Sequence, residues 1–204
     1  MFRFSYSLLI IMLGICLNSY AAGNPGDGKI KSQTCIACHS VDGNTVTPIW
    51  PKIAGLSESY ALKQLLDFQK GETGPRYNPT MYGIVQNLNK QDLEDLAAYY
   101  ATQTMTIGEA QPDQVALGQA IYRGGNLATG VPACAACHGP TGNGNSLALF
   151  PKLSGQNSAY IVEQMSNFKN NKRSNDPNHI MRDIAAKMTD KEIEAVASYV
   201  AGLH

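Results

Sequence analysis

The sequence predicts an all-α protein made of two tandem copies of one small domain. The chain repeats itself at a period of 100: residues 50–68 and 81–101 match residues 150–168 and 181–201 with 12 identities in 40 pairs, where unrelated sequences would give about two or three. Apolar residues near the end of each copy recur with the spacing of a helix. No segment shows the sustained alternation of apolar and polar residues that is typical of a strand.

Each copy is expected to end in an amphipathic helix. Apolar residues stand at i, i+3, i+4 and i+7 in both copies: Leu93, Leu96, Ala97 and Tyr100, and then Ile193, Val196, Ala197 and Val200. Capping boxes mark the expected starts of these helices: Asn89 with Asp92, and Thr189 with Glu192.

Residues that typically begin or end helices predict the other helices and the domain boundaries. A middle helix should begin near Ser57 and near Asn157, and Gly71 is a natural stop for the first of them. Pro112 opens a helix expected over about 114–122. We expect domains over 22–104 and 115–204, joined by a linker over 105–114. A domain of this size has a small apolar core and needs an additional stabilising element, such as a covalent cross-link or a bound metal.

The first 21 residues have the layout of a secretory signal peptide. Arg3 supplies a positive charge, residues 8–17 form an apolar run, and small residues precede a cleavage site after Ala21. The run is short for a bilayer, which argues against an uncleaved anchor, and the bulky Ile15 argues against a lipid on Cys16. We therefore expect export to an oxidising compartment, where free thiols are unusual.

The charge balance excludes a nucleic-acid partner. The chain carries 16 basic and 16 acidic residues, and removal of residues 1–21 takes away only Arg3. A basic footprint is therefore absent. No run of 18 apolar residues predicts a membrane-spanning helix.

The four cysteines that follow the leader form two Cys-x-x-Cys-His segments, Cys35–His39 and Cys134–His138. This motif is the signature of covalent haem c attachment. On one helical turn, the two thiols can reach the two vinyl groups of one porphyrin and form thioethers, and the next residue, histidine, lies below the iron. We therefore expect two haem c groups, bound through Cys35, Cys38, Cys134 and Cys137, with His39 and His138 as axial iron ligands.

Other interpretations of these cysteines fit less well. A thioredoxin-like redox pair would lie in a βαβ pattern, which the sequence does not show. A zinc site would place its two cysteine pairs about 15 to 20 residues apart, and the gap from Cys38 to Cys134 is far longer.

Met81 and Met181 are the expected sixth ligands of the two irons. They match at an offset of 100, and they follow His39 and His138 by 42 and 43 residues. Both follow a proline in a loop-like stretch, and a loop can bring a thioether over the face opposite the histidine.

Five other methionines and histidines are weaker candidates than this pair. Met165 and Met188 align with leucines and are expected in the core, while Met105 lies in the linker without a counterpart. His179 competes with Met181 because it lies two residues away, although it aligns with Pro79. His204 is terminal and is expected to be solvated.

Residues around the haems follow the same symmetry. The carbonyl groups of Pro51 and Pro151 could accept a hydrogen bond from Nδ1 of the two histidines and so leave Nε2 for iron; plain turn prolines are the alternative. Arg76 and Arg173 either pair with haem propionates or are solvated. We expect Lys52 and Lys152 to be solvated, and Tyr99 and Tyr199 to pack in the core.

An iron with two axial protein ligands has no open position for oxygen or peroxide. Such a centre moves electrons, so the protein is expected to be an electron carrier and not an enzyme. A thioether favours ferrous iron and raises the reduction potential relative to two histidines. Two similar centres in one chain imply a two-electron carrier or a short relay.

The pattern resembles the dihaem cytochrome c4 family, and the likeness covers essentially the whole chain after the leader. Segments 134–140 and 150–156 are especially similar to it. The resemblance implies two tandem class I cytochrome c domains whose haems face each other across a pseudo-twofold interface. It also implies periplasmic electron transfer from a quinol-oxidising cytochrome complex, the quinol–cytochrome c reductase, to a haem-copper terminal oxidase. We expect the protein to be a monomer. Some members associate with the membrane surface.

Two alternatives remain open at this point. A dihaem subunit of a larger periplasmic dehydrogenase, of the sulfide or alcohol type, would carry similar repeats. A dihaem peroxidase would need one open iron site and usually has a longer chain. The stretch from Tyr77 to Thr80 also departs from the family pattern, because it lacks the acidic residue present at Asp176.

Overall fold

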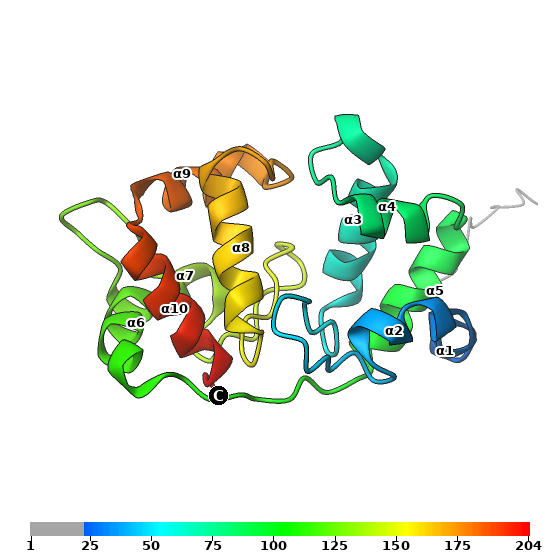
Figure 1. Ribbon diagram of the computed structural model, residues 1–204, viewed down its shortest axis with the longest axis horizontal. Helices are drawn as coiled ribbons and strands as arrows, with labels where there is room; N and C mark the ends of the chain where they lie inside the picture. Colours follow the sequence, from blue (N-terminus) through cyan, green and yellow to red (C-terminus); the bar gives the residue numbers. More distant parts are fainter. Residues whose placement is uncertain (1–22) are drawn as a thin grey trace, which may run out of the picture.

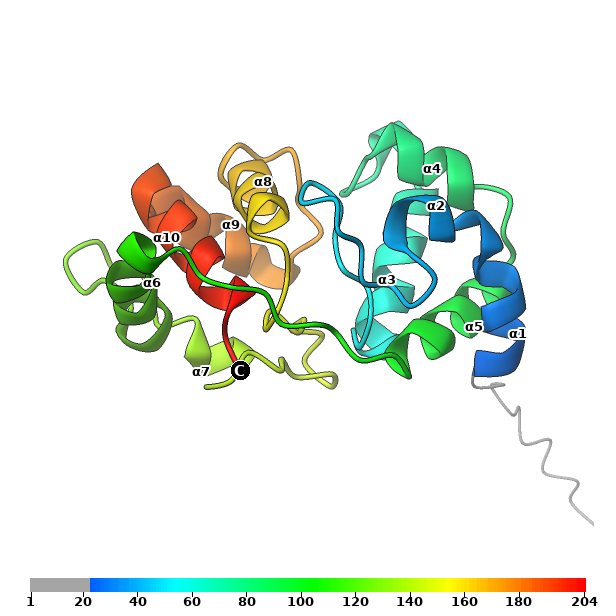
Figure 2. The ribbon, with the colours of Figure 1, turned by 60° about the horizontal axis from the view of Figure 1, so that its bottom comes forward.

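The protein consists of two helical lobes that lie side by side (Figure 1). The computed structural model describes residues 23–204, and the expected signal peptide lies outside them. An extended segment connects the lobes and runs along one side of both (Figure 2). Within residues 23–204 no strand forms, and only three isolated bridges pair backbone segments. The prediction of an all-α fold is therefore confirmed.

The two lobes contain matching helices in the same order. The first lobe has α1 (Pro25–Lys31), α2 (Ile36–His39), α3 (Glu58–Gln69), α4 (Pro79–Val85) and α5 (Lys90–Ala101). The second has α6 (Pro112–Gly124), α7 (Ala135–His138), α8 (Ser158–Lys169), α9 (Ile180–Lys187) and α10 (Asp190–Ala201). Short 3₁₀ turns lie at Ser32–Thr34, Gly71–Thr73 and Pro177–His179.

Each lobe is closed by a crossing of its first and last helices, α1 with α5 and α6 with α10. A glycine allows the close approach at both crossings. A Cβ atom on Gly28 would lie 2.0 Å from the carbonyl oxygen of Asp95, and one on Gly118 would lie 2.2 Å from that of Ala195. Since no side chain fits in that space, these two glycines fix where the helices cross.

The predicted helix starts agree with the structure. Asn89 with Asp92, and Thr189 with Glu192, form complete capping boxes at the beginnings of α5 and α10. The middle helices begin after Ser57 and Asn157, and α3 ends two residues before Gly71.

Two features of the helices differ from expectation. Helix α6 begins at Pro112 and ends at Gly124, so it is two residues longer at each end than predicted. Helix α1 was not predicted at all. Its signal is present in the sequence: the Asn24 side chain accepts hydrogen bonds from the first turn, and Pro25 occupies the first helical position, which is a common start.

The cores of the two lobes differ in extent. The second lobe has one apolar cluster that joins α6 and α10 and includes Tyr122, Tyr199 and Val200. The first lobe has two smaller clusters, one around Tyr99 and Tyr100 and one around Ala54 and Met105. Small cores of this kind indicate that a bound group completes the interior.

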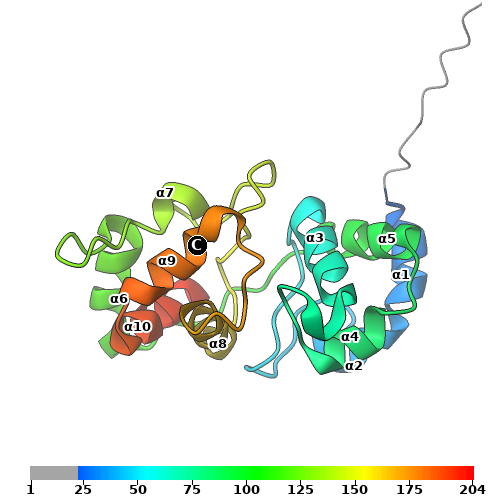
Figure 3. The ribbon, with the colours of Figure 1, turned by 90° about the horizontal axis from the view of Figure 1, so that it is seen from above.

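Helices α3 and α8 lie on the facing sides of the two lobes (Figure 3). Hydrogen bonds cross between the lobes, among them Ser174 N to Pro75 O at 2.8 Å and Lys63 Nζ to Asn175 O at 2.9 Å. Among the described residues, no helix is long and apolar enough to cross a membrane.

Candidate functional site

The two Cys-x-x-Cys-His segments form the single-turn helices α2 and α7. In each helix the histidine is the last residue and is buried. Nδ1 of His39 lies 3.0 Å from the carbonyl oxygen of Pro51, and Nδ1 of His138 lies 3.0 Å from that of Pro151. The hydrogen bonds expected at the two proline carbonyl groups are therefore present, and the alternative of plain turn prolines is wrong.

These bonds set the state of both imidazole rings. A carbonyl oxygen only accepts, so Nδ1 must carry the proton and Nε2 is left with its lone pair. Burial lowers the pKa of His39 and of His138, which keeps both rings neutral near pH 7. A neutral imidazole with a free Nε2 and a hydrogen-bonded Nδ1 is the form that binds a metal.

Met81 and Met181 lie in helices, and the expectation of a loop is wrong in this respect. Met81 is in the first turn of α4, where its backbone N–H bonds to the Asn78 side chain at 2.9 Å. Met181 is in the first turn of α9. The Asn78 cap holds the first turn of α4, whereas His179 makes no cap bond to α9 and the Asp176 carboxylate accepts from the backbone N–H of Arg182 at 3.0 Å instead. A held helix start positions each thioether more firmly than a free loop does.

The loop before α9 is two residues longer than the loop before α4. Pro79 and Pro177 both stand at the beginning of a helical turn, so they match at an offset of 98. The additional residues of the second lobe are Asn178 and His179, both with positive φ. His179 therefore belongs to an insertion. The neutral Asn78 caps α4 at the position that Asp176 occupies in the second lobe.

One continuous cavity of about 480 Å³ connects the two lobes. It is lined by all four motif cysteines, by both motif histidines, and by Met81 and Met181. The structure thus brings together every residue that the sequence predicts for haem attachment. The volume is in the range of sites for organic cofactors.

The competing ligand candidates are placed as predicted. His179 and His204 are exposed. Met188 is buried in the core of the second lobe with Met165 packed against it, and both also line the cavity. Met105 is buried against Ala54 and Leu56.

Arg76 and Arg173 are buried at the boundary between the lobes, so the alternative of solvated side chains is wrong. They pair with each other as a backbone bridge, and each guanidinium lies 4.5 Å above a phenylalanine ring, Phe68 or Phe168. Their side chains cross between the lobes: Arg76 Nη2 lies 2.7 Å from the Tyr160 hydroxyl, and Arg173 Nη2 lies 3.1 Å from that of Tyr60.

The lysine after each proline behaves differently in the two lobes. Lys52 is 8% exposed, and its Nζ donates to the carbonyl of Thr106 in the linker at 2.7 Å, so the expectation that it is solvated is wrong. Lys152 is half-buried and reaches Asn143. Tyr99 and Tyr199 are buried in their cores, as expected.

The residues around the cavity fit two haem c groups. Its four cysteines are free thiols, as thioether formation requires. Arg76 and Arg173 line it as well, and among residues 23–204 neither forms an ion pair; the nearby Asp176 carboxylate pairs with Arg182 instead. Buried cations normally have an anionic partner, which haem carboxylates would supply. The Tyr100 hydroxyl also lines the cavity, buried and without a hydrogen-bond partner among the described residues.

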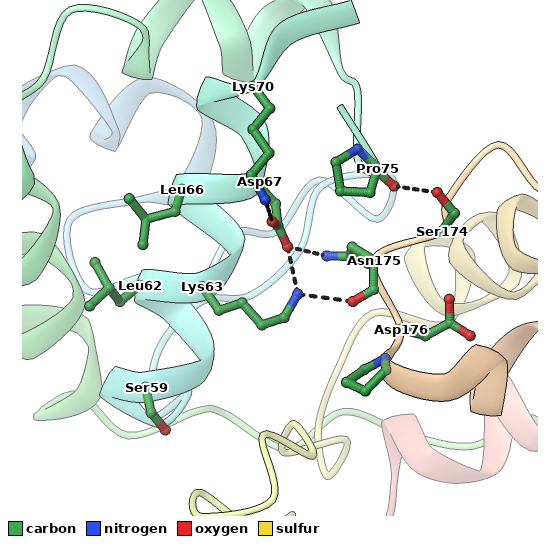
Figure 4. A pocket seen from close by; sticks show the side chains of 11 residues that line it. Ser59, Leu62, Lys63, Leu66, Asp67, Lys70, Pro75, Ser174, Asn175 and Asp176 are labelled. Atoms are coloured by element: carbon green, nitrogen blue, oxygen red, sulfur yellow. Dashed lines mark hydrogen bonds and ion pairs between the residues drawn. The ribbon is translucent and has the colours of Figure 1, made fainter. Parts of the chain in front are cut away.

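A second hollow lies between the lobes and has a different character (Figure 4). Its polar groups bond to one another: Asp67 accepts from Lys63 at 2.6 Å, from Lys70 at 2.8 Å and from Asn175 at 2.9 Å. This cluster holds the two lobes together and leaves no free ligand group among these residues.

The fold and the motifs define a cytochrome c. The sequence profile of the family described as "Cytochrome c" matches residues 27–104 and again residues 115–204. The duplication inferred from the sequence is thus a duplication of a cytochrome c domain.

Relatives define the class more closely. Cytochrome c4 of Azotobacter vinelandii is 45% identical over 96% of this chain and 97% of its own. The crystal structure of reduced recombinant cytochrome c4 from Pseudomonas stutzeri has a TM-score of 0.87 at 45% identity, and the match covers 90% of this chain and 100% of that chain. The chain belongs to the cytochrome c4 family. It is a dihaem electron-transfer protein with two covalently bound haem c groups.

A more distant relative has a different name. The thiosulfate dehydrogenase electron acceptor of Stutzerimonas stutzeri is 32% identical over 97% of this chain and 91% of its own.

Proposed function

We propose that the chain is a periplasmic relay in which His39 with Met81, and His138 with Met181, hold the two irons, and the four motif cysteines hold the porphyrins. The observation that carries the proposal is the single cavity that both sets of residues line. When bound, each haem takes up and releases one electron at its iron. Two haems held in this one cavity would allow an electron to pass from one to the other inside the protein.

The protein residues have three roles in this relay. The two histidines would bind iron through Nε2, because the Pro51 and Pro151 carbonyl groups hold the other ring nitrogen. The two methionines would supply the second protein ligand of each iron, which would leave no position for small ligands. Arg76 and Arg173, buried between the lobes, would supply positive charge to haem carboxylates.

We further propose that the carrier receives electrons from the quinol–cytochrome c reductase and delivers them to a haem-copper terminal oxidase. The domains would span residues 22–104 and 115–204, with residues 1–21 removed on export. Docking as a monomer, and contact with the membrane surface, are part of the same proposal. It rests on membership of the cytochrome c4 family.

A second candidate is supported by the more distant relatives. The protein would then accept electrons from a periplasmic dehydrogenase, as the name of the Stutzerimonas stutzeri relative indicates for that protein. Reduction of the purified oxidised protein by a quinol–cytochrome c reductase and by a thiosulfate dehydrogenase, compared at equal concentrations, distinguishes the two. The first proposal requires the reductase to be the faster donor.

The ligand assignment is tested by exchanging the two methionines one at a time. Met81→Ala and Met181→Ala should each remove roughly half of the weak far-red absorption that methionine gives on ferric haem. Each variant should still carry two haems by mass. Met165→Ala is the matched control: Met165 also lines the cavity but packs against the core of the second lobe, so its removal should leave the band intact. An undiminished band in Met81→Ala or in Met181→Ala would exclude that methionine.

A further inference from the structure

Gln156 of the second lobe reaches into the first lobe beside the axial histidine. It is 3% exposed. Its Oε1 accepts from the backbone N–H of Lys52 at 2.8 Å, and its Nε2 donates to the backbone carbonyl of Lys52 at 2.7 Å. Asn157 adds a bond from Nδ2 to the carbonyl of Trp50 at 2.8 Å. The second lobe thus holds the segment that carries Pro51.

These contacts form a chain of hydrogen bonds that ends at His39. The N–H of Lys52 and the carbonyl of Pro51 belong to the same peptide group. That carbonyl accepts from Nδ1 of His39 at 3.0 Å. Bonds linked through one peptide polarise each other, so acceptance at the N–H makes the carbonyl a stronger acceptor.

The second lobe has no equivalent chain from the matched position. His138 bonds to Pro151 at the same distance of 3.0 Å. The residue that corresponds to Gln156 in the first lobe is Leu56, which has no atom that can accept from the Pro151–Lys152 peptide. The two histidines thus make the same hydrogen bond to a proline carbonyl. The lobes differ in whether a glutamine accepts from the N–H of that same peptide group.

We infer that Gln156 is a positioning residue for His39. By strengthening the His39–Pro51 hydrogen bond, Gln156 lowers the reduction potential of the first haem relative to that of the second. The inference rests on the proposed ligation of iron by His39. A stronger bond at Nδ1 makes the imidazole a more basic ligand, and a more basic ligand stabilises ferric iron. Hydrogen bonding around the ligands is one of the means by which a protein sets haem potentials.

Replacement of Gln156 with methionine tests the inference, because methionine has similar length and no amide. In Gln156→Met the potential of the first haem should rise and that of the second should stay unchanged. We expect the equilibrium constant for electron transfer from the first haem to the second to fall about two- to fivefold, which is about 20 to 40 mV at 59 mV per tenfold. Spectroelectrochemical titration of the holoprotein measures both potentials.

A matched control removes a different bond between the lobes. Ser59→Ala deletes the bond from Ser59 Oγ to the carbonyl of Ser146 at 2.8 Å, which does not involve either proline. It should leave both potentials in place. A second variant and a second measurement apply if Gln156→Met loosens the interface. In reduced Gln156→Leu and in reduced Gln156→Met, the Nδ1 proton resonance of His39 should shift. The Nδ1 proton resonance of His138 should stay in place in both variants.

The outcomes separate this inference from the ligation on which it rests. If Gln156→Met keeps two six-coordinate haems and both potentials are unchanged, or both shift equally, the role of Gln156 is wrong and the ligation stands. If the wild-type protein lacks the methionine band or binds fewer than two haems, the ligation itself fails.

Discussion

The two lobes agree closely around the cavity and differ away from it. In both, the motif forms a one-turn helix, the histidine bonds to a proline carbonyl at 3.0 Å, and the methionine stands in the first turn of a helix. The comparison teaches that haem attachment fixes the residues that line the cavity. The outer parts of the two lobes are stabilised by different contacts.

An aromatic pair shows how the same space is filled by different residues. Tyr99 packs on Tyr100 at 5.0 Å between ring centroids, and Tyr199 packs on Tyr122 at 5.5 Å. The second ring comes from the last helix in the first lobe and from the first helix in the second lobe. A core needs volume at this place, and either helix can supply it.

The largest expected effect tests the feature that the lobes share. Gly28→Ala and Gly118→Ala each place a methyl group about 2 Å from a backbone oxygen of the crossing helix. Overpacking of this kind costs about 1–3 kcal/mol and occasionally more, and both variants should reach the upper part of that range. Guanidinium unfolding followed by circular dichroism measures it. Gly83→Ala, where a Cβ meets nothing within 4 Å, is the control, and an equal loss there would contradict the argument.

The next prediction concerns an acid that only the first lobe has. Asp95 accepts from the backbone N–H of Asn24 at 2.8 Å and pairs with Lys31, and the matched residue is Ala195. The Asn24 bond and the lysine lower the pKa of Asp95 to about 2. Because this is below the unfolded value of about 3.9, the stability it gives is full above pH 4 and is lost as the pH falls towards 2.

Asp95→Ala should therefore cost about 1–2 kcal/mol at pH 7 and progressively less below pH 4. Urea unfolding at several pH values measures the difference from wild type. Asp113→Ala in the second lobe is a comparison carboxylate, since it lies exposed in the first turn of α6. A wild-type advantage that stays constant down to pH 2 would mean that Asp95 is not the acid-sensitive group.

A smaller effect is expected at the caps of the last helices. Asn89→Ala and Thr189→Ala each remove a capping box, which costs about 1 kcal/mol. The loss should be somewhat larger in the second lobe, because Glu192 also binds Asn126 at 2.7 Å and joins the cap to the loop after α6. Thermal unfolding of both variants gives the two values. A larger loss for Asn89→Ala would reverse the comparison.

The smallest effect is expected from salt. Residues 22–104 hold 7 basic and 8 acidic residues, and residues 105–204 hold 8 of each. Neither lobe has a strong field of one sign, so electrostatic steering of a redox partner should be modest. Stopped-flow reduction at increasing ionic strength should show a change of about threefold or less. A steep decline would show that charges gather on one face and steer docking.

The sequence by itself determined the duplication, the all-α fold, the capped last helices and the set of candidate ligands. These features depend on local chemistry: two thiols and an imidazole on one helical turn, a polar side chain at a helix start, and apolar residues at helical spacing. Each can be recognised from neighbours in the chain.

Only the tertiary structure decided how the two lobes meet. The sequence left Arg76 and Arg173 open between haem carboxylates and solvent, and it placed Lys52 in solvent, yet all three are buried where the lobes or the linker come together. Gln156 gave no signal either, because its partner is a peptide group 104 residues away. Burial and long-range hydrogen bonds depend on which surfaces pack against each other, and that information is not contained in the spacing of residues along one segment.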